Sequence, residues 1–209
     1  MKKITMMQGL SFFYDTTKED NWRQGELLGF SKSVIVEQDL NLYPRKTKKM
    51  EILPRANSKL IKSSKNYYLF DLMQEEVGYL VFKLHSEKKQ LLTICWGEHI
   101  VDGVVRRKIG DLDFSVEVIV GEGITEYVNY FRRLGLRYME IHSEDALDIE
   151  YATVEPCPYP LHFVNRKFTN PLHQRIYDVA VRTLHLCMHE HYEDCPWREQ
   201  ALYALDSRN

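Results

Sequence analysis

The chain has 209 residues, which is long enough for one ordinary domain and part of a second. Hydrophobic residues make up 44% of it and charged residues 28%, a balance typical of a folded globular protein and not of a disordered chain. The formal net charge of −2 gives no general attraction to nucleic acids or anionic membranes, so we expect neither as a partner.

Residues 1–65 are predicted to hold one or two leading strands followed by a basic connection. The apolar residues available for the strands are Trp22, Phe30 and Val34 to Val36. Residues 41–64 are rich in turn-forming residues. From Arg45 to Lys65 there are eight Lys or Arg residues and one Glu. No base-reading motif accompanies this charge, which favours a solvated surface over nucleic-acid binding.

Neither the first ten residues nor the cysteines indicate a secretory or redox framework. Thr5, Gln8 and Gly9 interrupt the apolar residues near the start, so no signal peptide is recognised, and no run is long enough to span a bilayer. We expect a cytoplasmic or periplasmic location. The four cysteines are scattered without a CxxC pair, which favours buried free thiols: Cys95, Cys157, Cys187 and Cys195.

Residues 66–160 carry the signal of a jelly-roll-like β-sandwich. Short runs rich in branched and aromatic residues occur at 79–82, 91–96 and 116–120. Asp102-Gly103 lies between two apolar pairs and predicts a two-residue hairpin, because glycine accepts the positive φ of a type I′ turn. Polar and apolar residues alternate over 138–142, which predicts a strand with one polar and one apolar face. Several short strands with regular turn signals are typical of a sandwich.

The period of the sequence changes after residue 160. Three prolines, Pro156, Pro158 and Pro160, predict a domain boundary. Asn170 is then placed to cap a helix that has Pro171 in its first turn and ends near His191. The apolar stripe of this helix consists of Leu172, Ile176, Val179, Ala180, Thr183, Leu184 and Cys187. Residues 161–209 are therefore predicted to begin a helical domain.

Acidic residues gather near the end of the sequence. Asp194 precedes Pro196, and the proline predicts the start of a second helix. Glu199 and Asp206 are seven residues apart, so on a helix they would share a face roughly 10 Å apart along the axis. Carboxylates with aromatic residues nearby suit sugar chemistry.

Residues 194–200, Asp-Cys-Pro-Trp-Arg-Glu-Gln, followed by Asp206, resemble the acidic motif of the α-L-rhamnosidases of glycoside hydrolase family 78. Upstream segments resemble the same family in the same order: residues 68–71, 78–79, 97–98, 102–103 and 134–141. The resemblance covers about residues 67–208. It implies a mainly β fold, a sandwich followed by the first helices of an (α/α)6 barrel. Because the remaining hairpins of such a barrel have no counterpart, we expect the chain to be truncated.

The resemblance also implies roles for individual residues. Family 78 enzymes invert configuration, with an acid and a base across the sugar at roughly 6.5–9.5 Å. Glu199 would be the general acid, since position 200 is a glutamine, and the base would lie in a barrel segment outside this chain. Substrate-binding roles fall to Asp194, Asp206, Arg198 and Trp197, and no cofactor is implied.

Structural roles remain open for the same residues. The helix dipole favours Glu199 in a first turn, and Asp194 is placed to cap the helix. Arg198 is placed to pair with a neighbouring acid, and Trp197 is as well suited to a core as to a sugar ring.

Histidines near the motif raise the question of a metal. His185 and His189 are four residues apart on one helix face, with His191 and Cys195 close behind. This spacing suits two imidazoles on one ion. There is no HExxH and no closing ligand pair, so we expect no metal site and assign these histidines to solvent or to a sugar pocket.

Two functions from different classes follow. The first is the N-terminal part of an inverting glycoside hydrolase that removes terminal α-L-rhamnose from glycans, inactive without its base. The second is a carbohydrate-binding or scaffold β-sandwich without catalysis. If the chain is such a fragment, the apolar stripe of the first helix should be exposed or should pack against another copy of the chain.

Overall fold

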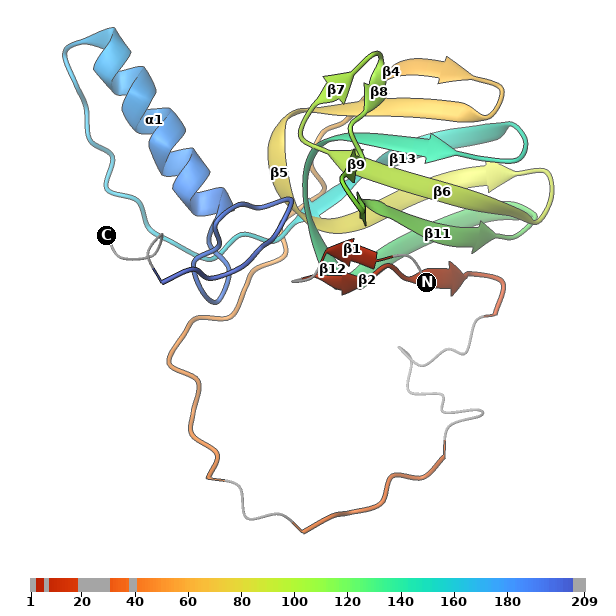
Figure 1. Cartoon of the computed structure of the whole chain (residues 1–209), viewed down its shortest axis with the longest axis horizontal. Helices are drawn as coiled ribbons and strands as arrows, with labels where there is room; N and C mark the ends of the chain where they lie inside the picture. The colour runs from red at the N-terminus through yellow and green to blue at the C-terminus, as the bar shows by residue number, and fades with distance from the viewer. Residues whose placement is uncertain (1–2, 6–7, 19–30, 38–40, 205–209) are drawn as a thin grey trace.

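The structure, a computed structural model, describes residues 3–5, 8–18, 31–37 and 41–204 (Figure 1). It is mainly β. The strands are β1 Lys3–Thr5, β2 Gly9–Leu10, β3 Phe13–Asp15, β4 Lys59–Ser64, β5 Tyr67–Ser86, β6 Gln90–Gly97, β7 Ile100–Val101, β8 Val104–Val105, β9 Lys108–Ile109, β10 Leu112–Asp113, β11 Ser115–Val120, β12 Gly123–His142 and β13 Leu147–Pro156. One helix, α1 Pro171–Leu186, occurs in the described part.

A seven-stranded sheet forms the body of the molecule. Its order is β13-β5-β12-β6-β11-β3, and β4 also pairs with β5. All pairs are antiparallel except β3 with β11. The two longest strands, β5 and β12, lose regular pairing midway, where residues 72–75 of β5 face Arg137 alone. There the β5–β12 pair folds back and forms two arms. β4 and β6 pair with one arm, and β13 pairs with the other. The predicted sandwich is thus built from a single bent sheet.

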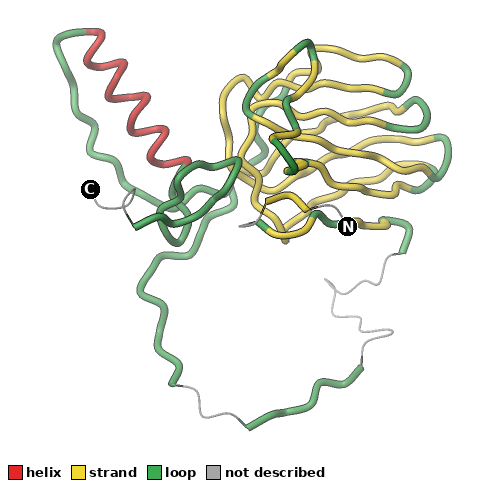
Figure 2. The backbone as a smooth tube through the Cα atoms, viewed as in Figure 1, coloured by secondary structure: helices red, strands yellow, loops and turns green. Residues whose placement is uncertain are grey.

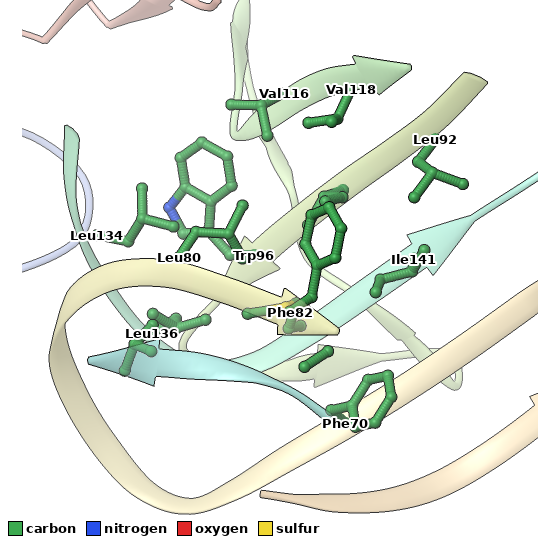
Figure 3. Close-up of a cluster of buried hydrophobic side chains, with 14 of the residues drawn as sticks. Phe70, Leu80, Phe82, Leu92, Trp96, Val116, Val118, Leu134, Leu136 and Ile141 are labelled. Atoms are coloured by element: carbon green, nitrogen blue, oxygen red, sulfur yellow. The ribbon is translucent and has the colours of Figure 1, made fainter. Parts of the chain in front are cut away.

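The hydrophobic core fills the space between the two arms (Figure 3). Phe70 comes from one arm of β5 and Phe82 from the other, and both are buried in the same cluster. Trp96 of β6 and Ile141 of β12 are fully buried beside them. Burying each such side chain contributes roughly 1.5–3 kcal/mol before the entropy of ordering is subtracted. This core fixes the sheet on which the C-terminal segment rests.

Local turn chemistry is confirmed at the predicted hairpin. Asp102 and Gly103 have φ values of 54° and 77° and connect β7 to β8. The alternation over 138–142 is confirmed for its apolar face, because Met139 and Ile141 are fully buried. On the other face Glu140 is only 2% exposed. The β7–β8 hairpin covers it, so that face is not simply solvated.

The N-terminal prediction is wrong in part. Val34, Ile35 and Val36 form no strand and are 84%, 94% and 76% exposed. Among the described residues before position 41, β3 joins the sheet, and Trp22 and Phe30 lie outside the described residues. Residues 59–64, expected to be connection, form β4. A three-residue strand such as β3 carries too few residues to show a period, and its partner lies about a hundred residues away.

The helix begins as predicted. The Asn170 side chain accepts a hydrogen bond from the Leu172 N–H at 2.8 Å, and Pro171 is the first helical residue. The helix ends at Leu186, earlier than expected. No residue of α1 is buried, and Leu172, Ile176 and Leu184 are half or more exposed, which confirms the exposed stripe. Whether another copy of the chain covers this stripe stays a prediction.

The second predicted helix is not formed in the described residues. Residues 196–199 make a turn, and the described residues after α1, up to residue 204, form no further helix (Figure 2). Residues 194–200 are held by contacts with one another and with the sheet, so the proline at position 196 starts a turn and not a helix. Among the described helices there is none of the length and apolar character needed to cross a membrane.

Candidate functional site

Asp194 closes the loop that carries the acidic motif, residues 194–200. Its N–H donates to the Ala201 carbonyl at 2.9 Å, and its Oδ1 accepts from the Ala201 N–H at 3.1 Å. The Cys195 thiol donates to Oδ2 at 3.0 Å. Both carboxylate oxygens therefore have partners inside the loop. Asp194 holds the loop in shape, and its contact with a sugar stays a prediction, while Asp206 lies outside the described residues.

Trp197 is part of the core. Its side chain is 4% exposed and packs against Phe114, with ring centroids 4.7 Å apart, and edge-on to His99 at 5.8 Å. The Gln8 amide donates to the Trp197 carbonyl at 2.6 Å, so the N-terminal segment also holds this residue. This burial fits the core role left open for Trp197, so the residue anchors the motif. Its contact with a sugar ring stays a prediction.

Residues 194–200 contain two acids, Asp194 and Glu199. The Asp194 carboxylate accepts from the backbone of the loop, whereas the described partners of the Glu199 carboxylate are side chains. The Glu199 side chain is 27% exposed. Arg198 lies 3.5 Å from Oε1, and the Tyr203 hydroxyl donates to Oε2. This hydrogen bond raises the pKa of Tyr203 to about 12, so the phenol remains a donor at neutral pH. Arg198 is therefore a neighbour of the acid, as predicted.

An open pocket of about 400 Å³ lies where the C-terminal loop meets β12. Glu199 is in its lining. The other lining residues are Gln8, Tyr79, Tyr130, Phe131, Arg132, Arg133, His189, His191, Glu193 and Gln200. Phe131 is 77% exposed, and Tyr130 packs edge-on to Tyr79 at 5.4 Å. Aromatic faces beside polar groups are a lining that sugars use.

Arg133 and Glu193 form a buried ion pair at the floor of this pocket. Arg133 Nη1 lies 2.9 Å from Glu193 Oε2, and the two side chains are 6% and 4% exposed. The same guanidinium donates to the carbonyls of Leu186, Met188 and Cys157. Burial raises the pKa of Glu193, and Arg133 opposes that shift. Arg133 thus binds the carbonyl of Leu186, the last residue of α1, and the carbonyl of Met188 just beyond it, which stabilises the chain where the helix ends.

The histidines of this region do not gather into a metal site. His185 Nε2 lies 2.8 Å from the Tyr159 carbonyl, and the rings of His189 and His191 are 5.8 Å apart. Burial and the nearby Arg133 lower the pKa of His189, which leaves a neutral imidazole facing the pocket. Within the described ranges, three donor side chains converge elsewhere, at Cys95, Glu140 and His142.

Sequence patterns missed part of the pocket. Arg133 and Glu193 are sixty residues apart, and nothing in either segment predicts their pairing. Tyr130 and Phe131 read only as strand residues. Their position at the break in β12 pairing, between Val128 and Arg133, turns them toward the loop. The sequence signal that could have found them is the interrupted alternation of polar and apolar residues at Tyr130 and Phe131.

No protein-family model matches the chain, and no curated protein matches it. Solved structures do. The structure of α-L-rhamnosidase from Dictyoglumus thermophilum aligns over 93% of this chain with a TM-score of 0.65 and 20% identity. The GH78 family rhamnosidase of Bacillus sp. GL1 aligns over 78% with a TM-score of 0.62 and 21% identity. The chain has the fold of part of an α-L-rhamnosidase.

The matching region is a small share of each rhamnosidase. It covers 23% of the Dictyoglumus thermophilum chain and 17% of the Bacillus sp. GL1 chain. The rhamnosidase from Klebsiella oxytoca with rhamnose bound matches at 22% identity over 68% of this chain and 31% of that chain, with a TM-score of 0.56. The expected resemblance is confirmed at the level of fold, and this chain spans less than a third of the length of these enzymes.

Proposed function

We propose that this chain supplies one side of a glycoside hydrolase site that acts on terminal α-L-rhamnosides, with Glu199 as the general acid. The observation that carries the proposal is the position of Glu199, partly exposed in a pocket walled by Tyr130 and Phe131. Hydrolysis of a glycosidic bond needs a carboxylic acid beside the leaving oxygen. The likeness of fold to α-L-rhamnosidases supports rhamnose as the sugar.

The base is the second requirement. An inverting enzyme places it roughly 6.5–9.5 Å from the acid, with room for water. Of the described residues that line the pocket, Glu193 is the one other carboxylate, and Arg133 holds it in a buried ion pair. A carboxylate so paired is poorly placed to activate water. We therefore assign Glu193 to the scaffold and place the base outside the described residues that line this pocket.

Hydrolysis and binding together test this function. L-rhamnose is titrated into the isotopically labelled chain while the amide signals of residues 130–133 and 199 are followed, and release of an aryl group from an aryl α-L-rhamnoside is measured in parallel. We expect saturable shifts at the pocket and no turnover. Glu199→Gln should weaken binding, whereas Glu87→Gln, a carboxylate with a 90% exposed side chain far from the motif in sequence, should not.

Two outcomes would contradict the proposal. If the chain does not bind rhamnose, rhamnose is not the sugar that this pocket recognises. If Glu199→Gln binds rhamnose unchanged, Glu199 is not part of the binding site. Turnover by the chain alone that disappears in Glu199→Gln would keep the acid and overturn the placement of the base. Saturable binding of unrelated sugars with equal affinity would favour a carbohydrate-binding module without catalysis.

A further inference from the structure

Three chemically different donor side chains lie together on the outer face of the sheet, away from the Glu199 pocket. Cys95 of β6 and Glu140 of β12 are directly opposed in register, and His142 follows Glu140 by two residues on the same face. Their Sγ, carboxylate and imidazole donor atoms all lie within 4.8 Å of one another. Strand pairing alone sets this arrangement, because side chains at i and i+2 of a strand share a face. The cluster is therefore part of the rigid sheet.

The two carboxylate oxygens of Glu140 have different surroundings: Oε1 accepts two hydrogen bonds, and Oε2 faces His142. Oε1 accepts from the Tyr67 hydroxyl at 2.7 Å and from the Val105 N–H at 2.6 Å. Oε2 lies 3.2 Å from His142 Nε2. A carboxylate that is 2% exposed and fixed by two donors to one oxygen presents the other as a directed ligand. Such outer hydrogen bonds are typical of ligands in metal sites.

We propose that Cys95, Glu140 and His142 bind one divalent ion of the zinc class, with water as the fourth ligand. Sulfur, nitrogen and oxygen donors in a set of three are ligands that zinc accepts in tetrahedral geometry. With bonds of about 2.05 Å, a tetrahedral nitrogen–oxygen edge is roughly 3.3 Å. The separation of Glu140 Oε2 and His142 Nε2 is 3.2 Å, so these two ligands already stand at the required spacing.

Arg107 completes the surroundings of the thiol. Its Nη1 donates to Cys95 Sγ at 3.2 Å, and its Nε lies 3.9 Å from Asp113. An N–H donor to a thiolate stabilises the negative sulfur that a metal requires. The positive charge of Arg107 is shared with Asp113, which reduces its repulsion of the ion. Arg107 thus acts through the sulfur, as a positioning residue.

A metal ion would reach the three ligands from solvent on the side of His142. Cys95 is fully buried and the Glu140 side chain is 3% exposed, but the His142 side chain is 44% exposed. An ion approaching from solvent meets His142 first and keeps a water on its open side. The same ligands without an ion form a Glu140–His142 ion pair, so the experiment has to separate a bound metal from that pair.

The test is titration of the metal-free chain with Co²⁺, a coloured probe for zinc sites. We expect one ion per chain, visible bands of tetrahedral cobalt and a thiolate-to-cobalt charge-transfer band, all reversed by excess Zn²⁺. Cys95→Ser should abolish the charge-transfer band. His142→Ala, which removes the partly exposed ligand, should abolish tetrahedral binding. Tyr67→Phe should weaken binding about 10–100-fold, the usual cost of losing an outer hydrogen bond.

The matched control is the double variant Cys187→Ser with Cys195→Ser. These two half-buried thiols lie near His189 and His191, so they are the rival sulfur ligands. Binding that persists in this variant supports the proposal. A charge-transfer band that disappears in it and survives in Cys95→Ser would overturn the proposal, as would the absence of saturable binding in the unaltered chain. These readouts do not depend on rhamnose, so failure here leaves the function of Glu199 untouched.

Discussion

Gly135 of β12 and Pro196 of the acidic motif are in backbone contact. A Cβ added to Gly135 would stand 2.0 Å from the Pro196 carbonyl oxygen and 2.9 Å from the Trp197 nitrogen. Real Cβ atoms do not approach backbone so closely, because the atoms would overlap. The motif therefore lies directly on the sheet, and the pocket that contains Glu199 depends on that contact.

Gly135→Ala should displace the motif from the sheet. The methyl group forces backbone apart, and Trp197 then loses its packing on Phe114. We expect a loss of about 1–3 kcal/mol of unfolding free energy, the range for overpacking. Urea denaturation followed by tryptophan fluorescence measures it. Gly121→Ala is the control, since among the described residues its Cβ would meet just the Thr17 side chain, at 3.1 Å. Equal stability of the two variants would contradict the contact.

Arg133→Met should be more damaging. It leaves the Glu193 carboxylate buried without its cation, and removing one partner of a buried ion pair costs about 3–5 kcal/mol. Three carbonyls lose a donor as well. Denaturation of the single variant and of Arg133→Met with Glu193→Leu forms the comparison. We expect the double variant to regain part of the loss, and a double variant less stable than the single one would argue against an unpaired charge as the cause.

Local chemistry made part of this molecule predictable. Asn170 with Pro171 and Asp102 with Gly103 determine a cap and a turn within a few residues, so neither needs the tertiary structure. The sequence of the motif, residues 194–200, was recognisable, but its backbone conformation was not predictable. Pro196 lies against the sheet because Gly135, 61 residues earlier, leaves room for its backbone, and Trp197 is buried because it packs on Phe114. Pairings over such distances leave no period in a sequence.

Trp197→Ala separates a core role from a sugar-binding role. Truncation of a buried tryptophan costs about 3–5 kcal/mol, and we expect a corresponding fall in the midpoint of thermal unfolding. Phe131→Ala is the counterpart, because Phe131 lines the pocket with 77% of its side chain exposed. It should weaken rhamnose binding and change stability little. If Trp197→Ala instead weakens rhamnose binding and changes stability little, Trp197 contacts the sugar.

Glu75 should make the stability of the chain fall as pH rises. It lies in the bend of β5, partly buried, and its Oε1 has no hydrogen-bond partner among the described residues. Burial, with the neighbouring charges of Glu98 and Glu76, raises its pKa from 4.5 to about 8, against the opposing effect of Arg182 and Arg137. In the unfolded chain the carboxyl has its ordinary pKa.

The direction follows from proton counting. Below about pH 4.5 Glu75 is protonated in both states and contributes nothing. Between pH 4.5 and about 8 the unfolded chain releases the proton while the folded chain keeps it, so the free energy of unfolding decreases with pH, and above pH 8 the loss is constant. Glu75→Gln mimics the protonated acid and should be more stable than the unaltered chain at pH 8 and equal to it at pH 4. Glu87→Gln, at a 90% exposed side chain, should show no such difference. Parallel stability curves for the unaltered chain and Glu75→Gln across this range would show that Glu75 is ionised in the folded protein.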